Sequence, residues 1–155
     1  MIAAPTGPRR LRPADLQQLE AAQSALRTGR VDDALSRLHS LQVRNPSHVT
    51  VLANLAMAQR RAGDAAAALA TFALALRQPD APAELWFNHA NLLRDLGRSG
   101  DAERAYRKAV VLRPTLHQAN TNLANLLSSQ KQPAQAESLH RTAVTAQPAV
   151  TSADI

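Results

Sequence analysis

Apolar residues recur along this chain at intervals of three and four, which is the spacing of one face of an α-helix. The pattern is clearest between residues 83 and 114. Its apolar positions are Leu85, Trp86, Ala90 and Leu93 before a glycine, and Ala102, Ala105, Tyr106 and Ala109 after it. Gly97 and Pro114 are typical helix-ending residues, so the stretch predicts two amphipathic helices joined by a tight turn. Two short helices cannot bury the tryptophan and tyrosine alone, so this hairpin needs neighbours.

The neighbours come from an internal repeat with a period of 34 residues. Four segments align without a gap, at residues 15–48, 49–82, 83–116 and 117–150. Their eighth residue is always alanine, at Ala22, Ala56, Ala90 and Ala124, and so is their twentieth, at Ala34, Ala68, Ala102 and Ala136. The turn position holds Gly29, Gly63, Gly97 and Lys131. A position in the second helix holds Leu38, Phe72, Tyr106 and His140. The closing position holds Pro46, Asp80, Pro114 and Pro148. Each segment therefore predicts the same hairpin, with alanine where its two helices cross.

Applied to the whole chain, the repeat predicts eight helices, two in each segment. They cover about residues 15–28, 31–44, 49–62, 65–78, 83–96, 99–112, 117–130 and 133–146. Asp15, Asp64 and Ser99 are residue types that cap helix N-termini, and they lie at or near expected helix starts. The helices form one domain over residues 15–150, with a proline-containing arm at 1–14 before it and a tail at 151–155 after it.

The period, the small residues at the helix crossings, the aromatic residue of the second helix and the closing proline resemble those of the tetratricopeptide repeat, or TPR, family. The third segment matches best, and the four segments of 34 residues cover 136 of the 155 residues. The resemblance implies an all-α fold, a right-handed superhelical solenoid of four helix-turn-helix repeats. It also implies that the first helix of each repeat lines a concave groove, where an extended peptide or partner segment would bind.

Composition excludes several other functions. The chain has no cysteine, so disulfides, thiolate zinc sites and cysteine nucleophiles are absent. The five histidines are scattered, and no HExxH motif, phosphate loop or paired carboxylates occur, so no enzyme, metal site or cofactor is expected. Half of the net charge of +6 lies in Arg9, Arg10 and Arg12, and aromatic residues make up only 3%, which does not favour nucleic-acid binding.

Asparagine is the polar residue that follows the repeat. Asn54, Asn88 and Asn122 share one column, and Asn91 and Asn125 share the column three residues later. Residues three apart are neighbours on a helix, and an amide can both donate to and accept from a peptide backbone. These residues are therefore candidates for main-chain binding of an extended peptide. Alternatively, the earlier asparagine of each pair bonds to the neighbouring repeat and fixes the stacking angle. The asparagine column is similar to that in the TPR arm of O-linked N-acetylglucosamine transferases.

Four arginines accompany the asparagines near the C-terminal ends of the predicted first helices. They are Arg27, Arg60, Arg61 and Arg94. Together they would favour a peptide that carries carboxylates, because guanidinium groups form forked hydrogen bonds. Each could instead complement the negative end of a helix dipole.

These patterns predict a non-catalytic protein-interaction scaffold. Two alternatives stay open: a substrate-recognition arm of a larger transferase whose catalytic domain lies beyond Ile155, and a self-assembling module. The outer face of the last helix, with Leu139, Ala143 and Val144, has no predicted cover, so either the chain continues or this face docks on another copy or a partner. The first residues lack the apolar run of a secretory signal and no stretch is long enough for a membrane span, so a cytoplasmic location is expected.

Overall fold

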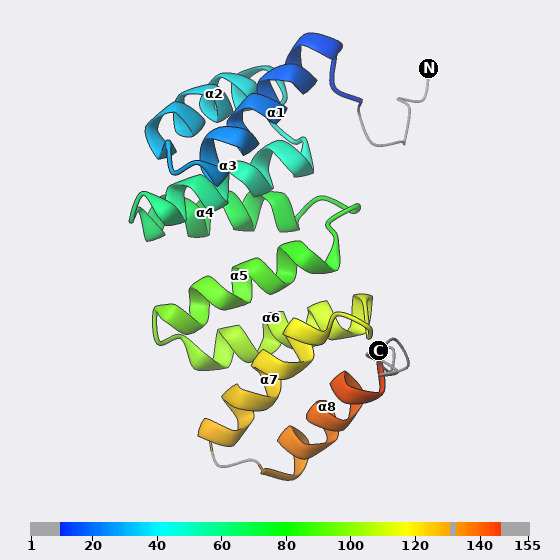
Figure 1. Cartoon of the computed structure of the whole chain (residues 1–155). Helices are drawn as coiled ribbons and strands as arrows, with labels where there is room; N and C mark the ends of the chain where they lie inside the picture. Colours follow the sequence, from blue (N-terminus) through cyan, green and yellow to red (C-terminus); the bar gives the residue numbers. More distant parts are fainter. Residues whose placement is uncertain (1–9, 131–132, 147–155) are drawn as a thin grey trace, which may run out of the picture. The chain divides into compact units, whose positions relative to one another are not determined.

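A computed structural model describes residues 10–130 and 133–146, except for the side chains of Pro133, Ala136 and Ala146. Within these residues the chain forms eight α-helices and no strand (Figure 1). They are α1 (Pro13–Arg27), α2 (Val31–Arg44), α3 (Val49–Arg61), α4 (Ala65–Leu76), α5 (Ala83–Asp95), α6 (Ser99–Leu112), α7 (His117–Ser129) and α8 (Pro133–Ala146). The prediction of an all-α repeat fold with two helices per segment is confirmed.

The helices belong to two compact units, one that ends at Ala81 and one that begins at Pro82. In the first unit, α1 packs on α2, α2 on α3 and α3 on α4, and α1 also touches α3. In the second unit, α5 packs on α6, α6 on α7 and α7 on α8. Each unit therefore holds two successive hairpins, and a second helix packs against the first helix of the next hairpin. The single domain over 15–150 and the superhelical handedness stay predictions.

Glycine ends the first helix in three repeats because the chain there adopts a left-handed conformation. The φ angles are 76°, 82° and 74° at Gly29, Gly63 and Gly97. In the third repeat the Gly97 N–H donates to the Arg94 carbonyl at 2.9 Å, and the Arg98 N–H donates to the Leu93 carbonyl at 2.9 Å. These two bonds satisfy the last carbonyls of α5 in a Schellman motif, and the same pattern occurs at the other two glycines. Lys131, at the fourth turn, lies outside the described residues.

The predicted crossing alanines are at the centre of each hairpin. Those whose side chains the structure describes have no exposed surface, at Ala22, Ala34, Ala56, Ala68, Ala90, Ala102 and Ala124. Larger side chains fill the space around them, among them Leu38, Phe72 and Tyr106 in the second helices. A small residue at the crossing lets two helices approach closely, so the column of alanines fixes the hairpin geometry. Ala136 belongs to the same column, but its side chain is outside the described set.

The structure corrects two of the expected helix caps. Helix α1 begins at Pro13 with Arg12 at its N-cap position, so Asp15 lies in the first turn and not at the cap. Ser99 is likewise the first residue of α6, behind Arg98. Proline at the start of a helix explains the first case, since its missing N–H is not needed there. Asp64 is a true N-cap, and its carboxylate accepts a hydrogen bond of 3.0 Å from the Ala67 N–H.

Asp15 instead ties the start of α1 to the end of α2. It is only 2% exposed. Its carboxylate accepts hydrogen bonds from Arg44 at 2.8 Å, Arg12 at 3.2 Å and Asn45 at 3.3 Å. Burial acts most strongly on the pKa of Asp15 and raises it, but the bonds from Arg44, Asn45 and Arg12 together hold the pKa below its usual value. The carboxylate is therefore ionised in the folded protein at neutral pH.

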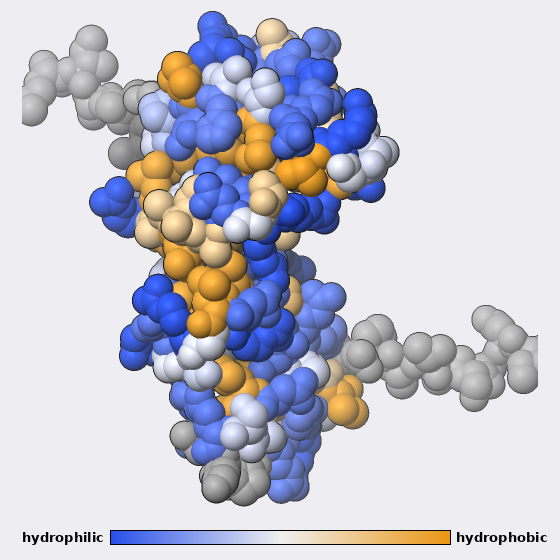
Figure 2. All heavy atoms as spheres, turned by 90° about the vertical axis from the view of Figure 1, so that its left-hand side faces the viewer, coloured by the Kyte–Doolittle hydropathy of each residue, from blue (hydrophilic) through white to orange (hydrophobic). Residues whose placement is uncertain are grey.

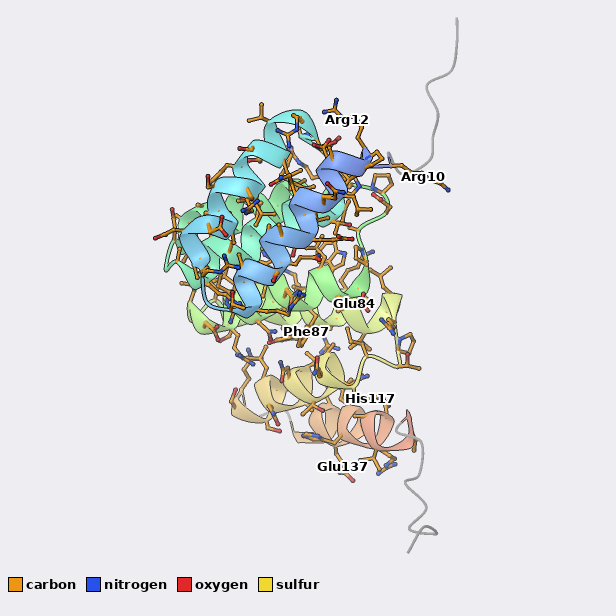
Figure 3. The ribbon with its side chains drawn as sticks, turned by 45° about the horizontal axis from the view of Figure 1, so that its top comes forward. Arg10, Arg12, Glu84, Phe87, His117 and Glu137 are labelled. Atoms are coloured by element: carbon orange, nitrogen blue, oxygen red, sulfur yellow. The ribbon has the colours of Figure 1, made fainter. Side chains whose placement is uncertain are left out.

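A second hairpin is closed in the same way. Glu84 in the first turn of α5 pairs with Arg113 directly after α6, 29 residues later, and this is the same separation as between Asp15 and Arg44. In Figure 3, Arg12 marks the first of these closures and Glu84 the second. Each unit thus begins with a hairpin whose open end is fastened by an acid on the first helix and an arginine at the end of the second.

Candidate functional site

The predicted site residues are divided between the two units. Unit one carries Arg27 on α1 and Asn54, Arg60 and Arg61 on α3. Unit two carries Asn88, Asn91 and Arg94 on α5 and Asn122 and Asn125 on α7. All nine lie on the first helices of their hairpins, as the repeat predicts.

In unit two an amide joins three helices. The Asn91 side-chain oxygen on α5 accepts a hydrogen bond of 2.6 Å from the Tyr106 hydroxyl on α6. The same oxygen accepts a second bond, of 2.9 Å, from the Asn122 amide on α7. Tyr106 is fully buried, so its hydroxyl needs a partner inside the protein. The bond from Asn122 to Asn91 joins two neighbouring repeats. For Asn122 it therefore matches the alternative interpretation, in which the asparagine fixes the stacking of the repeats.

The network leaves polar atoms on the same helix faces. Neither the Asn91 side-chain nitrogen nor the Asn122 side-chain oxygen takes part in it. Asn88 lies one turn before Asn91 and is partly buried, and Asn125 lies one turn after Asn122 and is exposed. Helices α5 and α7 therefore present two amides that the network holds in place, with Asn88 and Asn125 one turn away from them.

Phe87 borders these amides and was not singled out from the sequence. It lies on α5 one turn before Asn91 and is partly buried (Figure 3). Its ring centroid is 6.2 Å from that of Tyr106, at an interplanar angle of 51°. The signal was available, since Phe87 shares its repeat position with Leu19, Ala53 and Thr121 and is the one aromatic residue among them. An aromatic side chain next to fixed amides can contact an apolar side chain of a bound peptide.

The asparagine of unit one is used differently. The Asn54 amide donates to the Thr50 carbonyl at 2.8 Å, within its own helix. A buried pair links α3 to α4, in which the Thr71 hydroxyl donates to the Gln59 side-chain oxygen at 2.7 Å. The repeat pattern does not predict this pair, because neither residue type recurs in its column.

The four arginines lie at the C-terminal ends of α1, α3 and α5. Arg61 donates to the Leu26 carbonyl at the end of α1, at 2.6 Å, and so complements that helix terminus. Arg94 pairs with its neighbour Asp95 at 3.1 Å. Arg27 is exposed in the last turn of α1, and Arg60 is partly buried. For Arg61 the geometry matches the helix-dipole interpretation.

Asn120 is a buried polar residue that sequence reasoning missed. It has no exposed surface and lies where the preceding repeat has Trp86. Its amide donates to the Pro114 carbonyl at 2.8 Å, which fastens the connection between α6 and α7. The sequence contained a signal for Asn120, because the same repeat position holds Leu52 and Trp86 in the two preceding repeats.

No three histidine or carboxylate side chains among the described residues are grouped so that they could hold a metal ion. Burial first, and then the charge of Arg98, lower the pKa of His89 against the opposing effect of Asp101. His89 is therefore neutral at pH 7, as a packing residue would be. None of the described helices combines the length and apolar content that crossing a bilayer requires.

Figure 2 shows one face of the molecule, on which hydrophilic residues surround separate apolar patches. Six large apolar side chains are exposed among the described residues: Leu16, Val43, Leu96, Val111, Leu112 and Val144. Four of them, Val43, Val111, Leu112 and Val144, lie near the C-terminal ends of second helices. Isolated exposed apolar residues are normal in soluble proteins, so most of these need no special explanation.

Comparisons with known proteins agree with this geometry. A family model described as Tetratricopeptide repeat matches residues 19–83 and 87–150. A crystal structure of MamA aligns with a TM-score of 0.79 at 16% identity, over 85% of this chain and 77% of that one. A tetratricopeptide repeat protein from Parabacteroides merdae aligns with a TM-score of 0.75 at 21% identity, over 84% of this chain and 52% of that one. At these identities the likeness shows the fold alone. Comparison with curated protein sequences gives no match.

Proposed function

The chain belongs to the tetratricopeptide repeat family, and we propose that it is a non-catalytic scaffold that binds an extended peptide or partner segment along the first helices of its repeats. Repeats of this family commonly mediate protein interactions. The observation that supports the proposal most directly is the Asn91 network of unit two, because it holds amides on α5 and α7 in fixed positions. A binding surface whose polar groups are already ordered loses little entropy when a ligand binds.

The proposed contacts are made by the residues that flank the network on α5 and α7. An extended peptide exposes alternating N–H and C=O groups, and each asparagine amide can pair with either kind. Asn88 and Asn125 would contact the peptide backbone at the two ends of this surface. Phe87 would contact one apolar side chain of the ligand. Such a site recognises the peptide main chain more than its side chains, so it binds peptides of many sequences.

A preference for acidic peptides is a further part of the proposal and rests on fewer residues. Arg61 is bonded to the end of α1, so the exposed Arg27 and the half-exposed Arg94 are the better candidates for carboxylate contacts. Charge contacts at exposed sites weaken as salt screens them. The preference for acidic ligands should therefore fall at high ionic strength, whereas main-chain binding should persist.

A randomised peptide library displayed against the full chain tests this proposal. Enriched peptides should bind at micromolar strength, and Asn88→Ala with Asn125→Ala should weaken all of them by about tenfold, the effect of losing one or two hydrogen bonds. Arg27→Ala with Arg94→Ala should weaken only the acidic peptides. Asn54→Ala is the matched control, because that amide is bonded within its own helix. Fluorescence anisotropy with the enriched peptides gives the dissociation constants.

Two outcomes would contradict the proposal. The library could yield no enriched peptide, or the Asn88 and Asn125 double variant could bind the wild-type set at wild-type strength. In the second case the first helices of unit two are not the binding surface.

Two other candidates are kept. A substrate-recognition arm of a larger glycosyltransferase is supported by the asparagines that recur on α3, α5 and α7. Self-association is supported by the exposed end of α8 and is developed below. The cytoplasmic location expected from the sequence stays a prediction.

A further inference from the structure

The last hairpin repeats the third one, but among the described residues no helix packs on α8 in the way that α7 packs on α6. In the third repeat, α7 packs on α6, and there Tyr106 is fully buried and Val110 partly buried. His140 and Val144 occupy the same places on α8, 34 residues later. His140 is exposed, and Val144 is 69% exposed. The sequence-based expectation was wrong for Ala143, which is buried, and Leu139 is partly buried.

The free face of α8 carries charges as well as apolar surface. Glu137, Arg141 and Val144 lie four and three residues apart, with His140 beside Arg141, and so form one stripe of the helix. Glu137 and Arg141 pair at 3.1 Å, and both side chains are 74% exposed. Figure 3 shows Glu137 on the side of α8 that is turned away from α7.

This stripe is complementary to itself. If two α8 helices lie antiparallel about a two-fold axis, the acid of each helix meets the base of the other. In the same register Val144 lies opposite the partner's Ala134, so the valine is covered by a small apolar residue. A parallel arrangement would place like charges together. Closed two-fold dimers are the most common symmetric assemblies, and they use one surface twice.

The opposite end of the chain is a poor alternative cover. Where α7 has the buried residues Leu123 and Leu126, α1 has Ala21 and Ser24. Helix α1 also exposes Gln17, Gln18 and Glu20. A polar outer helix of this kind is typical of a capping repeat. Stacking of α1 on α8 of another copy would therefore bury too little apolar surface to replace α7.

We propose that two copies of this chain associate tail to tail through the free face of α8, antiparallel and about a two-fold axis. Glu137 then pairs with the partner's Arg141 in two symmetry-related contacts. This surface lies on the second helix of its hairpin. It uses no residue of the proposed peptide-binding surface, so either proposal can fail while the other holds.

Sedimentation velocity of the full chain, from micromolar to several hundred micromolar, tests the dimer. The wild type should show a concentration-dependent shift from monomer to dimer. Arg141→Glu should weaken association by at least about tenfold, because it places four like charges together. The double exchange of Glu137→Arg with Arg141→Glu should restore association, since the exchanged charges are again complementary across the two-fold axis.

The matched control is Arg104→Glu on α6, which makes the same charge change at an exposed arginine that also pairs with an acid of its own helix. It should dimerise like the wild type, and circular dichroism should show that all variants keep their helices. A wild type that is monomeric throughout would overturn the proposal, as would a charge exchange that does not restore association. Association that is lost on Glu20→Arg and kept on Arg141→Glu would show head-to-tail stacking instead and would equally overturn it.

Discussion

At the scale of single residues, identical side chains in one repeat column have different tasks. Asn54 bonds to its own helix, whereas Asn122 bonds to Asn91 of the preceding repeat. The partner decides the task, and the partner depends on what the adjacent helix carries. Asn122 meets Asn91 of the repeat before it, whereas the equivalent position before Asn54 holds Gln23. A shared column therefore predicts a shared position but not a shared contact.

Asn91 should contribute more to stability than Asn88. Asn91→Ala removes the acceptor for a buried tyrosine hydroxyl and for Asn122, and leaving a buried polar group unsatisfied typically costs about 1–3 kcal/mol. Asn88→Ala changes a partly buried side chain outside this network and should shift stability by less than about 0.5 kcal/mol. Urea denaturation followed by circular dichroism measures both changes. Equal stabilities of the two variants would show that the network does not hold α7 on α5 and α6.

At the scale of secondary-structure elements, three local features shape the hairpins, and the first and third repeats have all three. Alanine lets the two helices cross closely, a left-handed glycine ends the first helix, and in the first and third repeats an acid–arginine pair closes the open end. The turns of those two repeats are also alike, since Arg30 pairs with Asp33 and Arg98 pairs with Asp101. The hydrogen bond from Arg98 is the main reason that the pKa of Asp101 lies below its usual value.

The crossing alanines should tolerate enlargement poorly. Ala102→Leu adds three carbon atoms to a side chain that has no exposed surface, and such overpacking typically costs about 1–3 kcal/mol. The control is Ala66→Leu, an equal enlargement at an exposed position of α4, which should be almost neutral. Thermal melting compares the two variants. A wild-type melting temperature for Ala102→Leu would mean that the crossing can open without cost, which contradicts the packing described here.

At the scale of the whole molecule, the chain consists of two units of two hairpins each. Within a unit, helices contact mainly their neighbours in the sequence. Stability in such a protein is roughly a sum over hairpins and the interfaces between adjacent hairpins. The loss of one hairpin should therefore reduce stability in part and not abolish folding.

Truncation after Pro114 tests this additivity. It removes α7 and α8 and also the Asn122 bond to Asn91, but it leaves unit one and the α5–α6 hairpin intact. The shortened chain should keep most of its helical circular dichroism per residue and unfold at a lower urea concentration than the full chain. A truncated chain without helical signal would show that the hairpins fold only as a single cooperative set.

The sequence alone determined the repeat, the eight helices and the crossing alanines. These features follow from short-range rules: apolar spacing sets helix faces, glycine alone adopts left-handed turns easily, and a helix crossing admits only small residues. The N-cap expected at Asp15 was wrong because α1 begins two residues earlier at Pro13, and proline is favoured at the first helical position. Helix α6 begins at Ser99 as expected, but Arg98 occupies its N-cap position.

Only the tertiary structure decided which polar groups are used inside the protein. The Asn122 bond to Asn91 spans 31 residues, the Arg61 bond to Leu26 spans 35, and the Arg44 bond to Asp15 spans 29. Asn122 was a candidate for ligand binding because of its repeat position and its amide group. It forms a structural contact instead, because the packing of α7 brings Asn91 within hydrogen-bonding distance. Helical periodicity places residues on a face, but burial and hydrogen bonding depend on the helix that packs against that face.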